Sequence, residues 1–180
     1  DMANAATVSD FKLDRFEVTL GRFRRFVEAY PGSKPKAGDG AHPKIMGSGW
    51  QSLWDASLPK DKTALINEII TNCNHPPDPY FPVWNQPGMN ENKPMNCIDW
   101  YVSFAFCAWD KGRLPTNAEL SYAESGGSEQ RKYPWGATDP DGNYAVYNCG
   151  GDNNPATCVF ADLLDVGSRS PTGDGKYKQA

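Results

Sequence analysis

The clearest periodic pattern along the chain begins at Thr19 and predicts a helix that extends to about Tyr30. Apolar side chains recur there at intervals of three and four residues, the spacing that places them on one buried face of a helix. They are Phe23, Phe26, Val27 and Tyr30. The hydroxyl of Thr19 can cap the first turn, and Pro31-Gly32 ends the helix.

Before this helix, residues Val8 to Val18 show a weaker alternation that predicts a strand. Apolar and charged residues are interleaved there, as in a strand with one buried face. The alternation slips at Asp14-Arg15, so we expect a bulge or a strand end at that point. A second, short extended segment is expected at Pro94–Ile98.

A further helix is predicted over Lys62–Asn72, because Asp61 can cap its first turn and an apolar face follows. The apolar positions are Leu65, Ile66, Ile69 and Ile70. This helix lies inside a long stretch, Gly32 to Asn92, that is rich in proline, glycine and tryptophan. Such a stretch is typical of a functional or decorative insertion in a compact domain.

Two more helices follow this stretch. Asp99 can cap a helix that reaches about Lys111, and Thr116 with Glu119 forms the capping box of a helix that ends at Gly126-Gly127. The inward positions of the first of these helices are Val102, Ala105, Phe106 and Trp109. We expect Glu119 to serve as a capping partner rather than as a catalytic acid. We expect the large aromatic residues of this region to anchor the core and loops; they are Trp100, Trp109, Tyr122 and Trp135.

Composition adds that the domain is irregular. The 180 residues include 15 Pro, 17 Gly and 6 Trp, which predicts many ordered loops and few long elements. We expect one domain over residues 1–180, with an inserted segment at about 32–91. The net charge is −4 and the basic residues are scattered, so a nucleic-acid partner is not expected. No apolar run approaches the roughly 18 residues of a transmembrane helix.

The cysteines indicate an oxidising compartment. The chain has five of them, and no two form a Cys-x-x-Cys pair of the kind found in structural zinc sites. Together with the loop-rich composition, this favours disulfides and an extracytoplasmic location: secreted, periplasmic or attached to the surface as a lipoprotein. The odd number leaves one cysteine outside any pairing within residues 1–180.

Seven short motifs from Asn92 to Gly136 occur in an order and spacing that point to a known family. The motifs are Asn92–Trp100 (NKPMNCIDW), Ala105–Trp109 (AFCAW), Gly112–Thr116 (GRLPT), Ala118-Glu119, Tyr122-Ala123, Gly126-Gly127 and Tyr133–Gly136 (YPWG). With Asp14–Thr19 before them and Val166–Ser168 after them, they make the chain resemble the sulfatase-modifying-factor family, the formylglycine-generating enzymes. The likeness is weakest across the inserted segment.

The resemblance implies an α+β fold similar to C-type lectins, with sparse antiparallel strands, a few short helices and much ordered loop. It also implies an oxygen-dependent oxidation of a sulfatase cysteine to formylglycine, with copper held by two cysteines. In the family that pair lies beyond a Gly-Asn-Val-Trp-Glu-Trp motif, and the sequence stops at Ala180 before this motif. We therefore expect the domain to be incomplete and assign no catalytic residue and no copper ligand within residues 1–180.

Other site residues follow from the cysteines and from the resemblance. Cys73 can pair with Cys97 and tether the inserted helix, and Cys149 can pair with Cys158, although five cysteines allow other pairings. In relatives the position of Cys107 can form a disulfide with the C-terminal part of the domain.

Calcium is the second cofactor that the resemblance brings in. Asn148 matches a family position that binds this ion, and Asp162 is the acid closest to where the family has its partner. We hypothesise a calcium site at these two residues, which the Cys149–Cys158 disulfide replaces or supplements.

Two functions stay open at this point, and the sequence does not decide whether the chain is an enzyme. The first is a protein-cysteine oxidase that acts on a protein or peptide substrate. The second is a non-catalytic extracellular module that binds a ligand or serves a structural role on the same fold, since a fold alone does not fix a function. The two histidines lie far apart in the sequence, which does not favour the related iron-dependent sulfoxide synthases with their histidine cluster.

Overall fold

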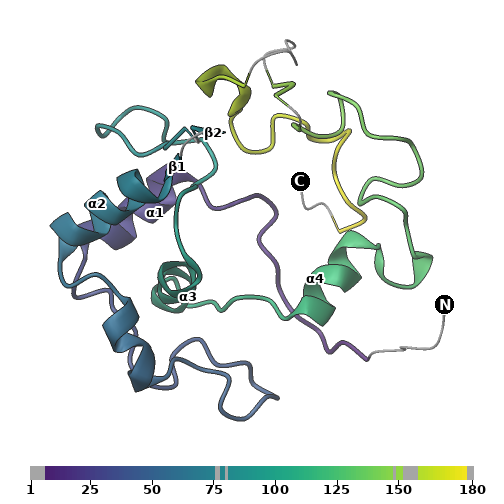
Figure 1. Ribbon diagram of the computed structural model, residues 1–180. Coiled ribbons are helices and arrows are strands. Elements are labelled where there is room, and N and C mark those ends of the chain that lie inside the picture. The colour runs from purple at the N-terminus through teal and green to yellow at the C-terminus, as the bar shows by residue number, and fades with distance from the viewer. Residues whose placement is uncertain (1–6, 76–77, 80, 148, 152–157, 178–180) are drawn as a thin grey trace. The chain divides into compact units, whose positions relative to one another are not determined.

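The computed structural model describes residues 7–75, 78–79, 81–147, 149–151 and 158–177. The chain forms two compact units, which are described here one at a time. One unit is the continuous segment Val18–Leu114, and the other combines the residues up to Glu17 with those from Pro115 onward. The regular secondary structure consists of a few short helices and very little β-strand, as Figure 1 shows.

The Val18–Leu114 unit is built on three helices around an aromatic core. They are α1 (Leu20–Glu28), α2 (Lys62–Asn72) and α3 (Trp100–Trp109). Helix α1 packs against both α2 and α3 (Figure 1). Phe23 of α1 stacks on Phe106 of α3 with ring centroids 5.3 Å apart, and Phe26 meets the same ring edge-on at 5.9 Å. The predicted buried face of the first helix is therefore confirmed, because all four of its residues are buried.

The predicted caps of these three helices are confirmed in place. Thr19 Oγ1 accepts a hydrogen bond from the backbone N–H of Arg22 at 3.2 Å. Asp61 Oδ1 accepts from Ala64 N at 2.8 Å, and Asp99 Oδ1 accepts from Val102 N at 2.7 Å. Each side chain satisfies an N–H that the first turn of a helix cannot satisfy internally. The caps therefore fix where each helix begins.

The predicted strand at Val8–Val18 was wrong. Residues 7–18 form no strand, and backbone hydrogen bonds to another segment begin only at the end of this stretch. There Val18 O accepts from Met95 N at 2.8 Å, Leu20 N donates to Lys93 O at 2.9 Å, and Thr19 forms an isolated bridge with Pro94. Alternation alone does not make a strand, because a strand needs a neighbouring backbone with which to pair. The strands of the described residues are β1 (Asn74–His75) and β2 (Asp78–Pro79), which pair antiparallel.

The inserted segment supplies part of the core of its unit rather than lying on it as decoration. Trp50 is 1% exposed and packs on Phe104 of α3, with ring centroids 5.6 Å apart. Its indole N–H donates to Asp55 Oδ1 at 2.7 Å, within the short 3-10 helix η2 (Ser52–Ser57). The Tyr30 hydroxyl donates to Pro59 O, which joins the middle of the segment to the chain after α1. The insertion is therefore held by buried aromatic and polar contacts.

The second unit contains α4 (Asn117–Glu124) and two short 3-10 helices, η3 (Gly127–Glu129) and η4 (Phe160–Asp162). The predicted capping box is present: Thr116 Oγ1 accepts from Glu119 N at 3.2 Å, and Glu119 Oε2 accepts from Thr116 N at 2.8 Å. Aromatic stacking pins the loops, with Trp135 between Tyr133 and Tyr144 at centroid distances of 5.3 and 5.4 Å.

Hydrogen bonds from Arg15 connect the two sequence segments that make up this unit. Arg15 donates to both Ser170 Oγ and Asp174 Oδ2 at 3.0 Å, and the Asp174 side chain is only 3% exposed. The loop after Gly167 is thereby tied to the N-terminal segment of the same unit.

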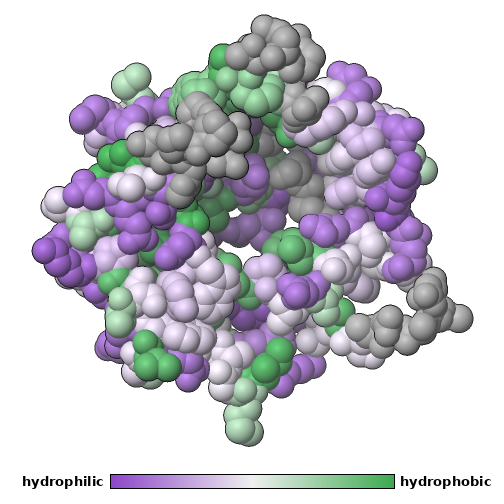
Figure 2. Space-filling view, viewed as in Figure 1, coloured by the Kyte–Doolittle hydropathy of each residue, from purple (hydrophilic) through white to green (hydrophobic). Residues whose placement is uncertain are grey.

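On the face of the molecule that Figure 2 shows, hydrophobic residues form small separate areas among hydrophilic ones. Among the residues described, no helix is long and apolar enough to cross a bilayer.

Candidate functional site

The disulfide Cys73–Cys97 lies where the end of α2 meets the segment that leads into α3. The two Cα atoms are 5.2 Å apart, within the usual range for a disulfide. Cys73 is the C-terminal cap residue of α2 and is buried, and Cys97 is half-buried with a positive φ of 61°. This is the pairing that the sequence analysis proposed, and it fixes the inserted helix to the motif Asn92–Trp100.

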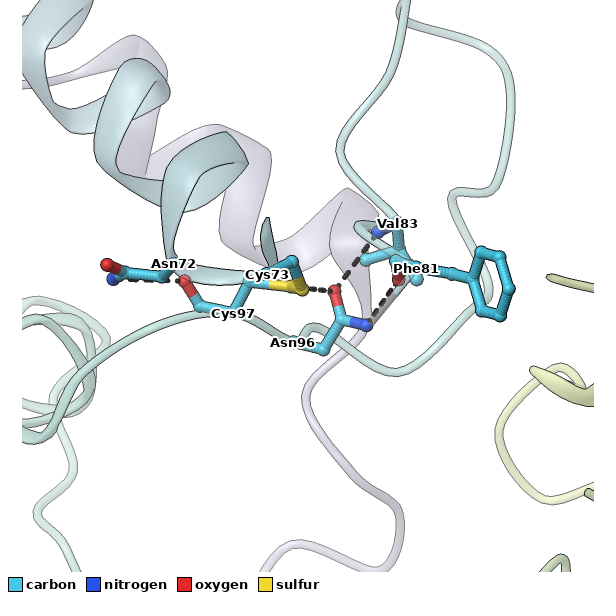
Figure 3. The surroundings of a disulfide bond; sticks show 6 residues. All are labelled: Asn72, Cys73, Phe81, Val83, Asn96 and Cys97. Atoms are coloured by element: carbon cyan, nitrogen blue, oxygen red, sulfur yellow. Dashed lines mark hydrogen bonds between the residues drawn. A yellow bond between two sulfur atoms is a disulfide. The ribbon is translucent and has the colours of Figure 1, made fainter. Parts of the chain in front are cut away.

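Asn96, the residue before Cys97, hydrogen-bonds to the backbone of Phe81 and Val83 beside this disulfide (Figure 3). Its Oδ1 accepts from Val83 N at 3.0 Å, and its Nδ2 donates to Phe81 O at 2.8 Å. The side-chain amide thus pairs with the backbone as a neighbouring strand would. Cys97 Sγ lies 3.1 Å from the same Oδ1, a polar contact because a disulfide sulfur has no proton to donate. Asn96 was not singled out from the sequence.

The second disulfide joins Cys149 to Cys158, with Cα atoms 4.6 Å apart. Nearby, Asp162 is buried in η4, and its Oδ2 accepts from Val159 N at 2.8 Å. Asn148, the other residue of the proposed calcium site, lies outside the described residues. In the described part of the chain, no three His, Cys, Asp or Glu side chains come together as a metal site. Calcium therefore stays a prediction that rests on the resemblance.

The cysteines of residues 1–180 do not fit a copper ion held by two thiolates. Four of the five are joined in the two disulfides, so they carry no S–H proton and cannot form thiolates. Cys107, half-buried on α3, belongs to neither disulfide and is the only remaining thiol. One thiol cannot supply the pair that the resemblance implies. These residues therefore provide no pair of copper-binding thiolates.

The aromatic residues that we expected to anchor the core and loops all make such contacts, although two of them are partly exposed. Trp109 packs against the core of its unit, and Trp135 donates its indole N–H to Thr138 O at 3.0 Å. Trp100 is 50% exposed, although its ring packs against Trp54. Tyr122 is 41% exposed, although its ring stacks on Tyr177. The helical periodicity already contained the signal for Trp100, because this position lies opposite the inward face defined by Val102, Ala105, Phe106 and Trp109.

The exposed Trp100 belongs to an aromatic cluster that the sequence did not reveal. Trp54 of η2 meets the Trp100 ring at 84° with centroids 5.2 Å apart, and Tyr101 meets Trp100 at the same angle and distance. Trp54 also contacts Trp50 and Phe104, at 5.5 and 5.8 Å. We call the surface formed by Trp54, Trp100 and Tyr101 the tryptophan corner. It joins the inserted segment to the first turn of α3.

Two acidic residues flank the tryptophans of the corner in the sequence, and a third interacts with one of them. Asp55 and Asp99 are the direct chain neighbours of its two tryptophans, and Glu68 of α2 interacts electrostatically with Asp99. Burial, and then repulsion from Asp99, raises the pKa of the Glu68 carboxyl above its ordinary value. No ion pair with another described residue compensates Asp55, Glu68 or Asp99, whereas the nearby Asp61 lies 3.9 Å from the Lys60 ammonium. The carboxylates beside the two tryptophans therefore have no ion-pair partner among the described residues.

Comparison with known proteins places these features in a family. The model of the family described as "Sulfatase-modifying factor enzyme 1-like domain" matches residues 2–160. The chain is 26% identical to the "Formylglycine-generating enzyme" of Mus musculus over 97% of its own length and 48% of that protein. It is 30% identical to the "Inactive C-alpha-formylglycine-generating enzyme 2" of the same organism, over 74% of this chain and 42% of the relative.

A third relative carries a different name. The chain is 33% identical to the "Hercynine oxygenase" of Mycobacterium tuberculosis, over 96% of this chain and 38% of that protein. The chain spans about half the length of the first curated relatives that it matches. No solved structure matches it. Since the family model covers most of its residues, the chain belongs to the family of the sulfatase-modifying factor enzyme 1-like domain.

Proposed function

We propose that the protein acts as a formylglycine-generating enzyme, which oxidises a cysteine of a sulfatase to formylglycine, and that residues 1–180 provide framework rather than the reacting thiols. The observation that carries the proposal is the match to the family model over residues 2–160, together with relatives named for this activity. The framework role follows from the cysteines, since four of the five are in disulfides. The partner is then a protein or peptide that contains the target cysteine.

A second candidate is a non-catalytic extracytoplasmic module on a fold similar to C-type lectins. Two observations favour it: the similarity to a relative named as inactive, and the exposed aromatic corner on the Val18–Leu114 unit. Exposure of the apolar surface of tryptophan to water is unfavourable in free energy, and tryptophan is more common at binding surfaces than elsewhere on a protein surface. In this case the corner, rather than a thiol pair, would carry the function.

We propose that the protein works outside the cytoplasm, whichever of the two functions it has. Two disulfides in one chain are stable in an oxidising compartment and rare in the reducing cytosol. The proposed location is secreted, periplasmic or surface-attached.

Calcium at Asn148 and Asp162 is a further proposal, supported by the oxygen ligands that this ion prefers. Calorimetric titration of calcium should release or absorb heat and raise the melting temperature, and the absence of both effects would remove this site.

An assay for the aldehyde product tests the proposed function. The complete product of the gene and a polypeptide of residues 1–180 are each incubated with copper, oxygen and a cysteine peptide from a sulfatase. A hydrazide reagent then detects formylglycine. We expect aldehyde from the gene product and none from residues 1–180. Aldehyde from residues 1–180 would contradict their role as framework, and no aldehyde from a folded, disulfide-bonded gene product would favour the binding module.

A further inference from the structure

The tryptophan corner has the geometry of a cation-binding surface. Its two indole rings stand at 84° with centroids 5.2 Å apart, so the edge of one ring meets the face of the other and the two ring planes are nearly perpendicular. The face of an aromatic ring carries the negative part of its quadrupole and attracts cations, and tryptophan does so most strongly. Trp100 is half exposed and Leu53 beside Trp54 is 87% exposed, which leaves this surface open to a partner.

The surrounding charge has the matching sign. Asp55, Glu68 and Asp99 contribute three carboxylates without a compensating cation among the described residues. The two lysines at the start of α2 are paired with other carboxylates, because Lys60 lies 3.9 Å from Asp61 and Lys62 pairs with Glu28. Asp55 accepts the indole N–H of Trp50, which orients its carboxylate but does not neutralise it.

Two of these carboxylates also act on each other: burial, and then repulsion from Asp99, raises the pKa of the Glu68 carboxyl. Glu68 belongs to α2, whereas Asp99 is the N-terminal cap of α3. Like charges that lie close together without a counter-ion destabilise the free protein, and a bound cation would relieve this cost. A cation bound beside these two carboxylates would therefore interact favourably with both.

We propose that the tryptophan corner binds a cationic side chain, lysine or arginine, that projects from a partner protein. The ammonium or guanidinium group lies against the faces of Trp54 and Trp100, and the carboxylates of Asp55, Glu68 and Asp99 provide the opposite charge. The exposed side chain of Leu53 contacts the aliphatic part of the bound residue. This inference is independent of the proposed oxidation, because it concerns binding to the Val18–Leu114 unit alone.

The test uses the intact, disulfide-bonded chain labelled with nitrogen-15, so that each indole N–H gives its own resonance. Short peptides that carry lysine or arginine are titrated against it, and a peptide in which citrulline replaces arginine is the neutral control. We expect the resonances of Trp54 and Trp100 to shift saturably with the cationic peptides and not with the citrulline peptide. Added salt should weaken the binding, since the charges involved are partly exposed.

Variants locate the binding surface. Trp100→Leu and Glu68→Gln should each weaken peptide binding about two- to fivefold, the size expected for a cation at an exposed aromatic or acidic site. Tyr147→Leu changes an equally exposed aromatic residue of the other unit and should leave the affinity unchanged. Trp54→Leu repeats the test if Trp100→Leu fails to fold. Equal binding of the citrulline peptide, unchanged affinity in the folded Trp variants, or no saturable shift with any peptide would overturn the proposal.

Discussion

At the scale of single residues, Asn96 connects more of the chain than its size suggests. Its amide oxygen and nitrogen pair with the backbone at Val83 and Phe81, and its neighbour Cys97 carries the disulfide to α2. One polar side chain therefore fixes the chain that enters the motif Asn92–Trp100. Because these backbone groups are partly buried, they have little water to replace the amide if it is removed.

Asn96→Ala should lower the free energy of unfolding by about 1–3 kcal/mol, since it leaves a backbone donor and a backbone acceptor without their partner. Urea unfolding followed by tryptophan fluorescence measures this loss. Asn72→Ala is the matched control, because Asn72 is exposed and its amide reaches Cys97 O only at 3.5 Å. A loss of stability in the control as large as that in Asn96→Ala would show that the amide pairing is unimportant.

Glu68 gives the protein a dependence on pH whose sign is set by its surroundings. Burial and Asp99 raise the pKa of this carboxyl above the ordinary value of 4.5, so the folded state binds the proton more tightly than the unfolded state. Its contribution to stability is therefore complete below pH 4.5 and is lost as the pH rises through the raised pKa.

Glu68→Gln should consequently stabilise the chain at pH 7, by less than about 1 kcal/mol because solvent screens a partly exposed group. The gain should disappear in acid, where the native glutamate is also neutral. Thermal melts of the two proteins at several pH values measure the difference. A gain that is constant with pH would show that the substitution acts through packing and not through charge.

At the scale of elements, the helix α4 depends on its capping box. Thr116→Ala removes the hydroxyl that accepts from Glu119 N and should destabilise the helix by about 1 kcal/mol. Hydrogen exchange of the α4 amides measures the change locally. Thr116→Ser keeps the hydroxyl and should keep the protection, so equal loss of protection in both variants would contradict the capping role.

The same scale shows what the sequence could predict. The starts of α1, α2, α3 and α4 were predicted correctly, because a cap and the residues that it satisfies lie within one turn of each other. The strand at Val8–Val18 was wrong, because pairing depends on a backbone segment that is distant in the sequence. Ile70 was placed on the buried face of α2 but is 46% exposed, since packing partners decide how far around the helix that face extends.

The candidate site was predictable only in part. Both disulfide pairings were among those that the cysteine positions allowed, but their choice depends on which loops meet in space. The tryptophan corner could not be foreseen, because Trp54 and Trp100 are 46 positions apart in the numbering and belong to different elements. The copper-binding pair implied by the resemblance has no counterpart among the cysteines of residues 1–180.

At the scale of the whole chain, the disulfides set the number of reactive thiols. A chain denatured without reductant should react with one equivalent of a thiol reagent, at Cys107, and with five equivalents after reduction. Mass spectrometry of the labelled chain measures both numbers. More than one labelled cysteine before reduction would show that at least one of the two pairs is not formed in solution.

The distribution of buried apolar side chains has a calorimetric consequence. Among the described residues, every buried hydrophobic side chain except Ala123 belongs to the Val18–Leu114 unit. The heat-capacity increment of unfolding scales with the apolar surface that becomes exposed. Disruption of the residues from Pro115 onward should therefore be accompanied by only a small increment, and most of the increment should arise when the aromatic core around Phe23 and Phe106 is exposed to water.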